Sequence, residues 1–191
     1  MTRISAVDSY DLVVDHTLGR WEALRQGGYD EERLVKRKLP LLGPILDDHE
    51  SPNVEDKEVG IIRGKVSLVG FQEECWCEDA QTTLMENDFQ LPPVRFLLAI
   101  GAQWPALQTQ HTILCLGTFW FYSDGELLWP ILTTENGKRI ADTFASNTIH
   151  PSIKNIGLSD VLDPEKMTTR QHFPTTFRIL TISKEDAWER I

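Results

Sequence analysis

Apolar and polar positions in the second half of the chain follow the pattern of an antiparallel meander. The apolar runs at 111–122 and 126–134 are separated by a Ser-Asp-Gly triplet, and a third segment at 138–146 follows Asn136-Gly137. Asn-Gly is the dipeptide that a type I′ hairpin turn prefers, because both of its central residues need a positive φ. We therefore predict three consecutive strands over these ranges, against which the other elements pack.

The N-terminal pattern is different and indicates helices. Apolar residues recur at three- and four-residue spacing within 8–26, and Gly27-Gly28 then provides the usual end of a helix. The residues with this spacing are Tyr10, Val13, Val14, Leu18, Trp21 and Leu24. A second helix is predicted over 31–39, where acids at the start and bases at the end suit the helix dipole. The segment 43–58 is rich in Pro and acids without periodicity, so a loop is predicted there.

Between these regions, β-branched residues at 59–71 predict a strand, with Gly64 as a bulge. The segment 72–79 is predicted to be extended, with Glu73, Cys75 and Cys77 on one side and Glu74, Trp76 and Glu78 on the other. Pro92-Pro93 precedes an apolar helix at 94–104. A strand at 175–183 and a short helix at 184–191 complete the chain, after an irregular region at 147–173.

This order predicts an α+β protein in which N-terminal helices and one central helix pack on a curved antiparallel sheet. No repeat or linker divides residues 1–191, so a single domain is predicted. The order of elements is similar to the cone-shaped α+β rolls of the nuclear-transport-factor-2-like superfamily. That resemblance implies a bent sheet wrapped around a helix, and the region 147–173 departs from it.

Length and composition limit where such a chain can work. A chain of 191 residues with 41% apolar residues can bury a core without disulfides or metals. Three cysteines do not suggest a disulfide framework, which fits a reducing compartment. The N-terminus lacks the apolar core of a signal peptide, and Arg95 interrupts the longest apolar stretch. We therefore predict a cytoplasmic protein that does not associate with membranes.

The negative charge is concentrated in one part of the chain. The net charge is −10, and residues 47–88 carry twelve acids against three bases, a net −9. The acids are Asp47, Asp48, Glu50, Glu55, Asp56, Glu58, Glu73, Glu74, Glu78, Asp79, Glu86 and Asp88. Nucleic-acid binders need clustered Lys and Arg to displace counterions, so direct binding to DNA or RNA is not expected. The same placement of charge is also compatible with solubility alone.

Motifs for catalysis and for cofactors are incomplete. In 60–67, three residues instead of four separate the glycines, and Val66 stands where a phosphate loop needs Ser or Thr. Cys75 and Cys77 have no further ligands at zinc-binding spacing, so buried, inert thiols are favoured. The Gly-x-Ser-x-Gly motif of many hydrolases is absent. We therefore predict no cofactor and no metal site, and the sequence favours a non-enzymatic protein.

The charge pattern instead predicts an acidic binding or inhibitor protein that docks on a basic protein partner. Clustered carboxylates speed encounter with a positive surface, and an aromatic anchor adds contact energy. The predicted partner-binding residues are Asp47, Asp48, Glu50, Glu55, Asp56, Glu58, Glu74, Trp76, Glu78 and Asp79. Partners of this kind include a nuclease-type toxin, with this chain as its immunity protein, and a nucleic-acid-handling complex blocked by a DNA-mimicking inhibitor.

The alternative is a small-molecule enzyme or ligand-binding protein with an apolar pocket inside an α+β roll. Such pockets have few polar groups and leave weak traces in a sequence. The first candidates for its polar groups are Asp15, His16, His111 and Cys115. A deep pocket with converging polar groups would favour this alternative, whereas a filled core with a continuous acidic face would favour the binding protein.

Overall fold

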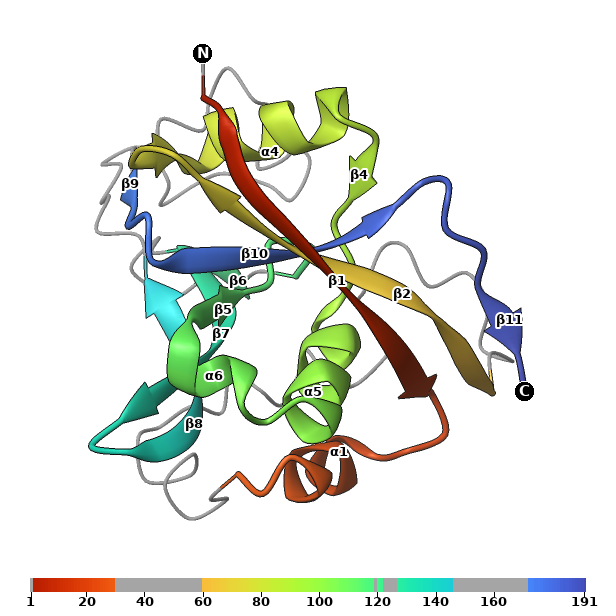
Figure 1. The fold of residues 1–191 in the computed structure, drawn as a ribbon. Coiled ribbons are helices and arrows are strands. Elements are labelled where there is room, and N and C mark those ends of the chain that lie inside the picture. The colour runs from red at the N-terminus through yellow and green to blue at the C-terminus, as the bar shows by residue number, and fades with distance from the viewer. Residues whose placement is uncertain (1, 30–59, 119, 122–126, 146–171) are drawn as a thin grey trace.

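The computed structural model describes residues 2–29, 60–118, 120–121, 127–145 and 172–191 (Figure 1). Within these residues, a nine-stranded sheet runs in the order β1-β2-β10-β5-β7-β6, with β11 on β2, β4 on β10 and β8 on β7. Its strands are β1 (Ile4–Asp15), β2 (Ile61–Phe71), β4 (Phe89–Gln90), β5 (Thr112–Leu114), β6 (Trp120–Phe121), β7 (Leu127–Glu135), β8 (Lys138–Ala145), β10 (Phe177–Ser183) and β11 (Glu189–Arg190).

The sheet is mixed, because β10 pairs with β5 in parallel and the other strands pair antiparallel. A separate two-stranded sheet joins β3 (Cys75–Trp76) to β9 (His172–Phe173). The helices of the described residues are α1 (Arg20–Gln26), α4 (Cys77–Glu86), α5 (Val94–Gln103) and α6 (Leu107–Gln110). The predicted α+β class is confirmed, but the prediction of a wholly antiparallel sheet is wrong, because β10 and β5 pair in parallel.

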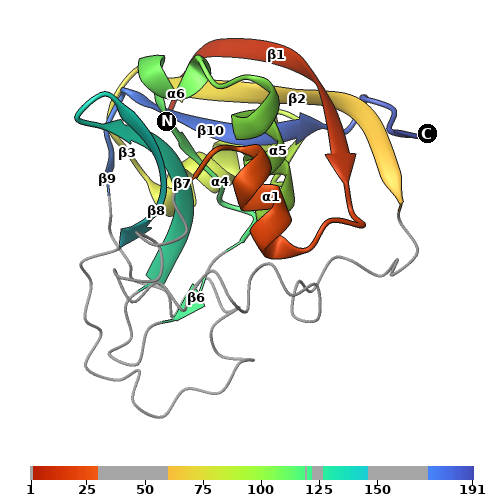
Figure 2. The ribbon, with the colours of Figure 1, turned by 90° about the horizontal axis from the view of Figure 1, so that it is seen from below.

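Both faces of the central strands are buried. Leu68 of β2 and Leu180 of β10 belong to the first core, which also contains residues of α1 and α5. Their chain neighbours Val69 and Ile179 belong to a second core, which contains residues of α4. Successive side chains of a strand point to opposite faces, so one strand serves both cores. Figure 2 shows α1 and α5 on the same side of β1 and β2.

The predicted helix at 8–26 is wrong for its first half, which is strand β1. Leu12 and Val14 are buried against the first core, and β1 pairs antiparallel with β2 along its whole length. Burial at alternate positions is typical of a strand. The spacing of Tyr10, Val13 and Val14 also fits a helical face, which is why a helix was predicted. The helical second half is α1, and it ends at Gly27 as predicted. The order that carried the resemblance to rolls therefore differs at its N-terminal end.

Gly64 has a role other than the predicted bulge. The register of β1 and β2 is continuous there, with Gly64 opposite Leu12, and its irregularity lies between Ile4 and Ala6. A Cβ at position 64 would lie 2.4 Å from the Trp188 ring, so glycine makes room for that indole. Trp188 also meets Phe96 edge to face, with ring centroids 5.0 Å apart. The predicted C-terminal helix is wrong, because this segment is a turn followed by β11.

The segment predicted to be extended at 72–79 forms only the two-residue strand β3, after which α4 begins at Cys77. The predicted alternation of side chains along 72–79 is therefore wrong from Cys77 onward. The strand predicted at 59–71 is confirmed as β2, and the strand predicted at 175–183 is confirmed as β10. The apolar helix predicted after Pro93 is confirmed as α5.

The meander is confirmed in its second half. Asn136 and Gly137 have φ values of 52° and 73°, and they join β7 to β8 in an antiparallel hairpin. The first predicted strand is instead divided into β5 and β6, and both pair with β7. The helix predicted at 31–39 and the loop at 43–58 lie outside the described residues, as does nearly all of 147–173.

A buried polar pair joins the segment after α1 to α6 and to the β7–β8 hairpin. The Tyr29 hydroxyl donates to Gln108 Oε1 at 2.5 Å, and Gln108 Nε2 donates to the carbonyls of Thr133 and Ile140 at 3.2 Å. A Cβ on either Gly27 or Gly101 would lie 2.1 Å from the Tyr29 side chain. These two glycines therefore leave the space that the tyrosine fills.

Candidate functional site

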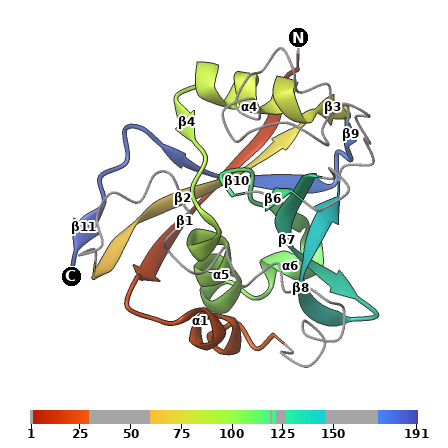
Figure 3. The ribbon, with the colours of Figure 1, turned by 180° about the vertical axis from the view of Figure 1, so that it is seen from behind.

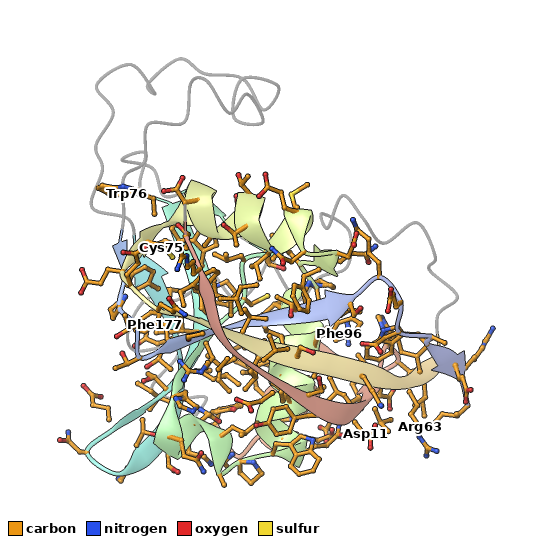
Figure 4. The ribbon with its side chains drawn as sticks, turned by 45° about the horizontal axis from the view of Figure 1, so that its top comes forward. Asp11, Arg63, Cys75, Trp76, Phe96 and Phe177 are labelled. Carbon is orange, nitrogen blue, oxygen red and sulfur yellow. The ribbon has the colours of Figure 1, made fainter. Side chains whose placement is uncertain are left out.

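The described acids of the segment 47–88 lie after β2, at the end of the molecule where α4 is found. Glu74 follows β2, Trp76 lies in β3, and Glu78 and Asp79 lie in the first turn of α4. Figure 4 shows the Trp76 side chain at the outer end of this region, and Figure 3 shows α4 and β3 together beside the N-terminus. The predicted partner-binding residues Asp47, Asp48, Glu50, Glu55, Asp56 and Glu58 lie outside the described residues.

Helix α4 separates its acids from its apolar residues. Ala80 and Leu84, four residues apart, are fully buried in the second core. Asp79, Thr82 and Glu86 are exposed, and their spacing of three and four residues places them on one face of the helix. Met85 lies next to this face with 63% of its surface exposed. Folding thus directs the two acids away from the core and toward a common side.

Acids from the segment after β2 and from α4 both influence the pKa of Cys75. Burial raises the pKa of the Cys75 thiol to about 11, and the carboxylates of Asp79 and Glu73 contribute to that rise. Both carboxylates therefore act on the same thiol although they belong to different elements. We call the group formed by Glu73, Glu74, Asp79 and Glu86 the acidic end; all four side chains are exposed.

Few bases accompany the acidic end. The sequence contains no Lys or Arg between Lys65 and Arg95. Among the described residues, Glu73, Asp79 and Glu86 form no ion pair, whereas Asp88, beyond α4, pairs with Lys184 at 3.2 Å. The backbone of Arg3 is adjacent, because its carbonyl accepts a hydrogen bond from Gln72 N. Within the described part of the chain, three of the four carboxylates of the acidic end are thus exposed without an ion pair.

A cavity of about 220 Å³ lies between β1, α1 and α5. Its walls are mainly apolar, with Leu18, Leu98 and Ala99 among them, and they also include Asp15 and Arg95. Arg95 is 6% exposed, and its Nη1 donates to the carbonyls of Leu18 at 2.8 Å and Asp15 at 3.3 Å. The guanidinium therefore holds the chain between β1 and α1 in place.

Of the four residues predicted for a pocket, the structure brings two to this region. Asp15 lines the cavity, and a hydrogen bond from the Thr17 hydroxyl lowers the pKa of the Asp15 carboxyl, with a smaller contribution from Arg95. His16 follows it and meets Phe96 edge to face, with ring centroids 6.2 Å apart. Asp15 is therefore ionised at neutral pH.

The other two predicted residues do not join them. His111 lies near Arg178 and Asp8; burial and Arg178 lower the pKa of its imidazole, while Asp8 opposes them. Cys115 is fully buried, and its Sγ donates to the Pro92 carbonyl at 3.1 Å. Burial raises the pKa of this thiol to about 12, so it is a thiol rather than a nucleophilic thiolate at neutral pH.

Sequence reasoning missed two residues that organise this side of the molecule. Arg95 was noted only as an interruption of an apolar run, although a charge inside an apolar helix is a signal of buried pairing. Gln103 caps the edge of β1 by bonding both backbone groups of Val13, and no sequence pattern indicated this contact.

No helix in the described part of the chain is long and apolar enough to cross a membrane. The same residues contain no group of three or more His, Cys, Asp or Glu side chains placed to hold a metal ion. Comparison with family models, with curated proteins and with solved structures finds no match to this chain.

Proposed function

We propose that this chain is an acidic binding protein that docks its acidic end on a basic protein partner, as an inhibitor or an immunity-type protein does. The observation that carries the proposal is the exposed face of α4, where Asp79 and Glu86 point away from the core beside an exposed Met85. Glu73 and Glu74 extend this charge at the N-terminal end of the helix.

The energetic roles within the acidic end differ. Exposed carboxylates act at long range: they raise the rate of encounter with a positive surface and penalise acidic competitors. Met85 and Trp76 supply apolar contact area, which carboxylates alone do not provide, and Met is enriched in interfaces. A partner that used both would bind with a strong dependence on salt, because exposed charges are screened within about 10 Å at 0.1 M ionic strength.

The test is affinity capture from the native host with three forms of the chain, followed by mass spectrometry. The first form is the wild type. The second carries Glu73→Gln, Glu74→Gln, Asp79→Asn and Glu86→Gln. The third neutralises four exposed acids elsewhere, Glu22, Glu135, Glu185 and Glu189, and so changes the net charge equally.

We expect a basic protein to be retained by the wild type and by the control form, and to be lost from the form neutralised at the acidic end. Its retention should also fall steeply as salt is raised from 50 to 500 mM, since the attraction is screened. Equal loss from both neutralised forms would show that net charge alone matters, and the proposed docking surface would be wrong.

A second candidate function is favoured by the cavity beside Asp15 and Arg95. An apolar cavity of 150 Å³ can hold benzene, so about 220 Å³ suits a slightly larger molecule. In this function the chain binds a small, mainly apolar ligand within an α+β roll. The cone-shaped curvature of the roll stays a prediction. Filling the cavity by Ala99→Phe should abolish binding of such a ligand without affecting the acidic end.

A further inference from the structure

The outer edge of β1 has backbone groups that face away from the sheet. β1 is the last strand at one end of the sheet, with β2 on its inner side. Val13 N and Val13 O bond the Gln103 side chain, so these two groups point away from β2. Outward and inward residues alternate in an antiparallel pair, and the register is continuous from Ala6 onward. The backbone groups of Asp11, Ser9 and Val7 therefore also point outward.

The chain itself covers only part of this edge. Gln103 bonds Val13, and Trp104 Nε1 donates to the Asp11 carbonyl at 3.0 Å. No described residue bonds the outward backbone groups of Ser9 and Val7. Ser9 is exposed, and the Val7 side chain is 47% exposed. Exposed edges of this kind accept an additional strand unless a charge, a proline or a covering element prevents it.

The charges along this edge favour a basic occupant. Asp8 and Asp11 are exposed and form no ion pair within the described residues, although Lys65 lies opposite Asp11 in the register. A second copy of this chain would bring its own net charge of −10, so a cationic segment is the better match.

The position of the edge connects it to the acidic end. Ile4 of β1 pairs with Phe71, the last residue of β2. Glu73 and Glu74 follow Phe71 closely in the chain. Figures 1 and 3 both show the N-terminal end of β1 beside α4. A partner that docks on the acidic end can therefore reach the free part of β1 with an extended segment.

We propose that β1 accepts an extended, basic segment of the partner as an added antiparallel strand that bonds the backbone of Val7 and Ser9 and begins beside Asp11, whose carbonyl stays bonded to Trp104. This inference rests on the proposed function, because that function supplies the positive charge of the partner. Residues directly opposite in an antiparallel pair have Cβ atoms about 5 Å apart, so each edge side chain selects its opposite residue. Cations opposite Asp11 and Asp8 and an apolar residue opposite Val7 give the pattern Lys-x-x-Lys-Val, read from the N-terminus of the segment.

The probe is a fluorescent peptide that contains Lys-Thr-Thr-Lys-Val, titrated with the full chain at low salt and measured by anisotropy. The second threonine lies opposite Ser9, and its N–H points at the Ser9 carbonyl. Methylating that nitrogen removes the bond and introduces a clash. Methylating the neighbouring nitrogen, opposite Tyr10, changes only a group that points away from β1. A peptide with Glu in place of both Lys tests the charge.

The matching variants of the chain are Ser9→Pro and Ser9→Ala. The Ser9 N–H points outward, so proline removes no bond to β2, and an edge strand tolerates it there. Both variants remove the 3.0 Å contact between the Ser9 and Ser67 hydroxyls, so Ser9→Ala controls for its loss. Far-UV circular dichroism confirms that each variant is folded, and the methylated peptides test the same contact on the unmodified chain.

We expect Ser9→Pro and methylation opposite Ser9 each to weaken peptide binding by about tenfold or more. Ser9→Ala and methylation opposite Tyr10 should change binding by about twofold at most. Strand addition is overturned if the Lys peptide does not bind, or binds equally well after methylation opposite Ser9. If that happens while neutralising the acidic end still releases the partner, only the strand is wrong and the proposed function stands. If peptide binding behaves as expected while neutralisation has no effect, the acidic end is wrong instead.

Discussion

The side chain of Gln103 pairs with the backbone of Val13 as a neighbouring strand would. Its Nε2 donates to the Val13 carbonyl at 2.6 Å, and its Oε1 accepts from the Val13 N–H at 3.0 Å. One residue at the end of α5 thus satisfies both outward groups of an edge position. Gln103 and Trp104 thus bond the outward backbone groups of Val13 and Asp11, whereas no residue in the described part of the chain bonds those of Ser9 and Val7.

Replacing Gln103 by Leu should remove both bonds. Because the freed backbone groups can bond water, the expected loss is about 1–2 kcal/mol of unfolding free energy, measured by urea denaturation. Gln110→Leu is the matched control, since Gln110 is exposed and its side chain makes no bond in the described structure. Equal stability of the two variants would contradict the role of Gln103.

Tyr29→Phe should destabilise the fold more than the loss of a single hydroxyl group suggests. The change deletes one hydroxyl but leaves Gln108 Oε1 without a donor in a side chain that is 2% exposed. An unsatisfied buried acceptor costs about 1–3 kcal/mol. The control is Tyr10→Phe, because the Tyr10 hydroxyl has no hydrogen-bond partner among the described residues. Thermal denaturation in which both variants melt together would show that the buried pair contributes nothing.

Gly64→Ala should displace Trp188, because the new Cβ would lie 2.4 Å from its ring. Overpacking of this kind typically costs about 1–3 kcal/mol. Gly19→Ala is the control, since a Cβ there meets nothing within 4 Å. In a Trp188→Ala background the cost of Gly64→Ala should largely disappear, because the clashing ring is gone. Additive losses in that double-mutant cycle would mean that the two residues are not coupled.

Stability should fall at alkaline pH because of the two buried thiols. The pKa values of Cys75 and Cys115 are raised from 9.0 to about 11 and about 12 by burial. Above pH 9 the unfolded chain loses these protons while the folded chain keeps them, so the unfolded state is increasingly favoured. Each thiol contributes a slope of up to about 1.4 kcal/mol per pH unit. Burial also raises the pKa of Tyr29, which adds to the effect above pH 10.

Urea denaturation between pH 8 and pH 11 checks this effect. Cys115→Ala should lower stability at pH 8, because it leaves a cavity, but it should flatten the decline above pH 9. A decline with the same slope in the wild type and the variant would show that the Cys115 thiol does not titrate in this way.

Two of the elements that the sequence predicted correctly, the β7–β8 turn and helix α5, are specified by local chemistry. Asn136-Gly137 needs no distant partner to form its turn, and the residues after Pro93 form an apolar helix through local propensity. The region of β1 was predicted to be helical because its burial at alternate positions depends on pairing with β2. The two strands are separated by more than forty residues, so no local pattern indicates that pairing. Cys77 was predicted to be extended for a similar reason. The helix that begins there is stabilised by burial of Ala80 and Leu84 in the second core, which is a tertiary contact.

The candidate site was predictable to a similar extent. Composition located the acids, and the spacing of Asp79 and Glu86 is sufficient to place them on one face once α4 is known. The contacts of Arg95 and Gln103 join residues about eighty to ninety positions apart, so no local pattern could indicate them. Trp188 is similar, because Gly64, which makes room for its ring, lies on β2, far earlier in the chain.

The central claim is that the acidic end faces a basic partner, and zero-length cross-linking tests it most directly. A carbodiimide joins a carboxylate to a lysine only where the two are in contact, so the linked residues report the interface. With the captured partner, mass spectrometry should find the cross-links at Glu73, Glu74, Asp79 and Glu86. Cross-links confined to Glu22, Glu135, Glu185 and Glu189, or spread evenly over all eight, would contradict the proposed docking surface.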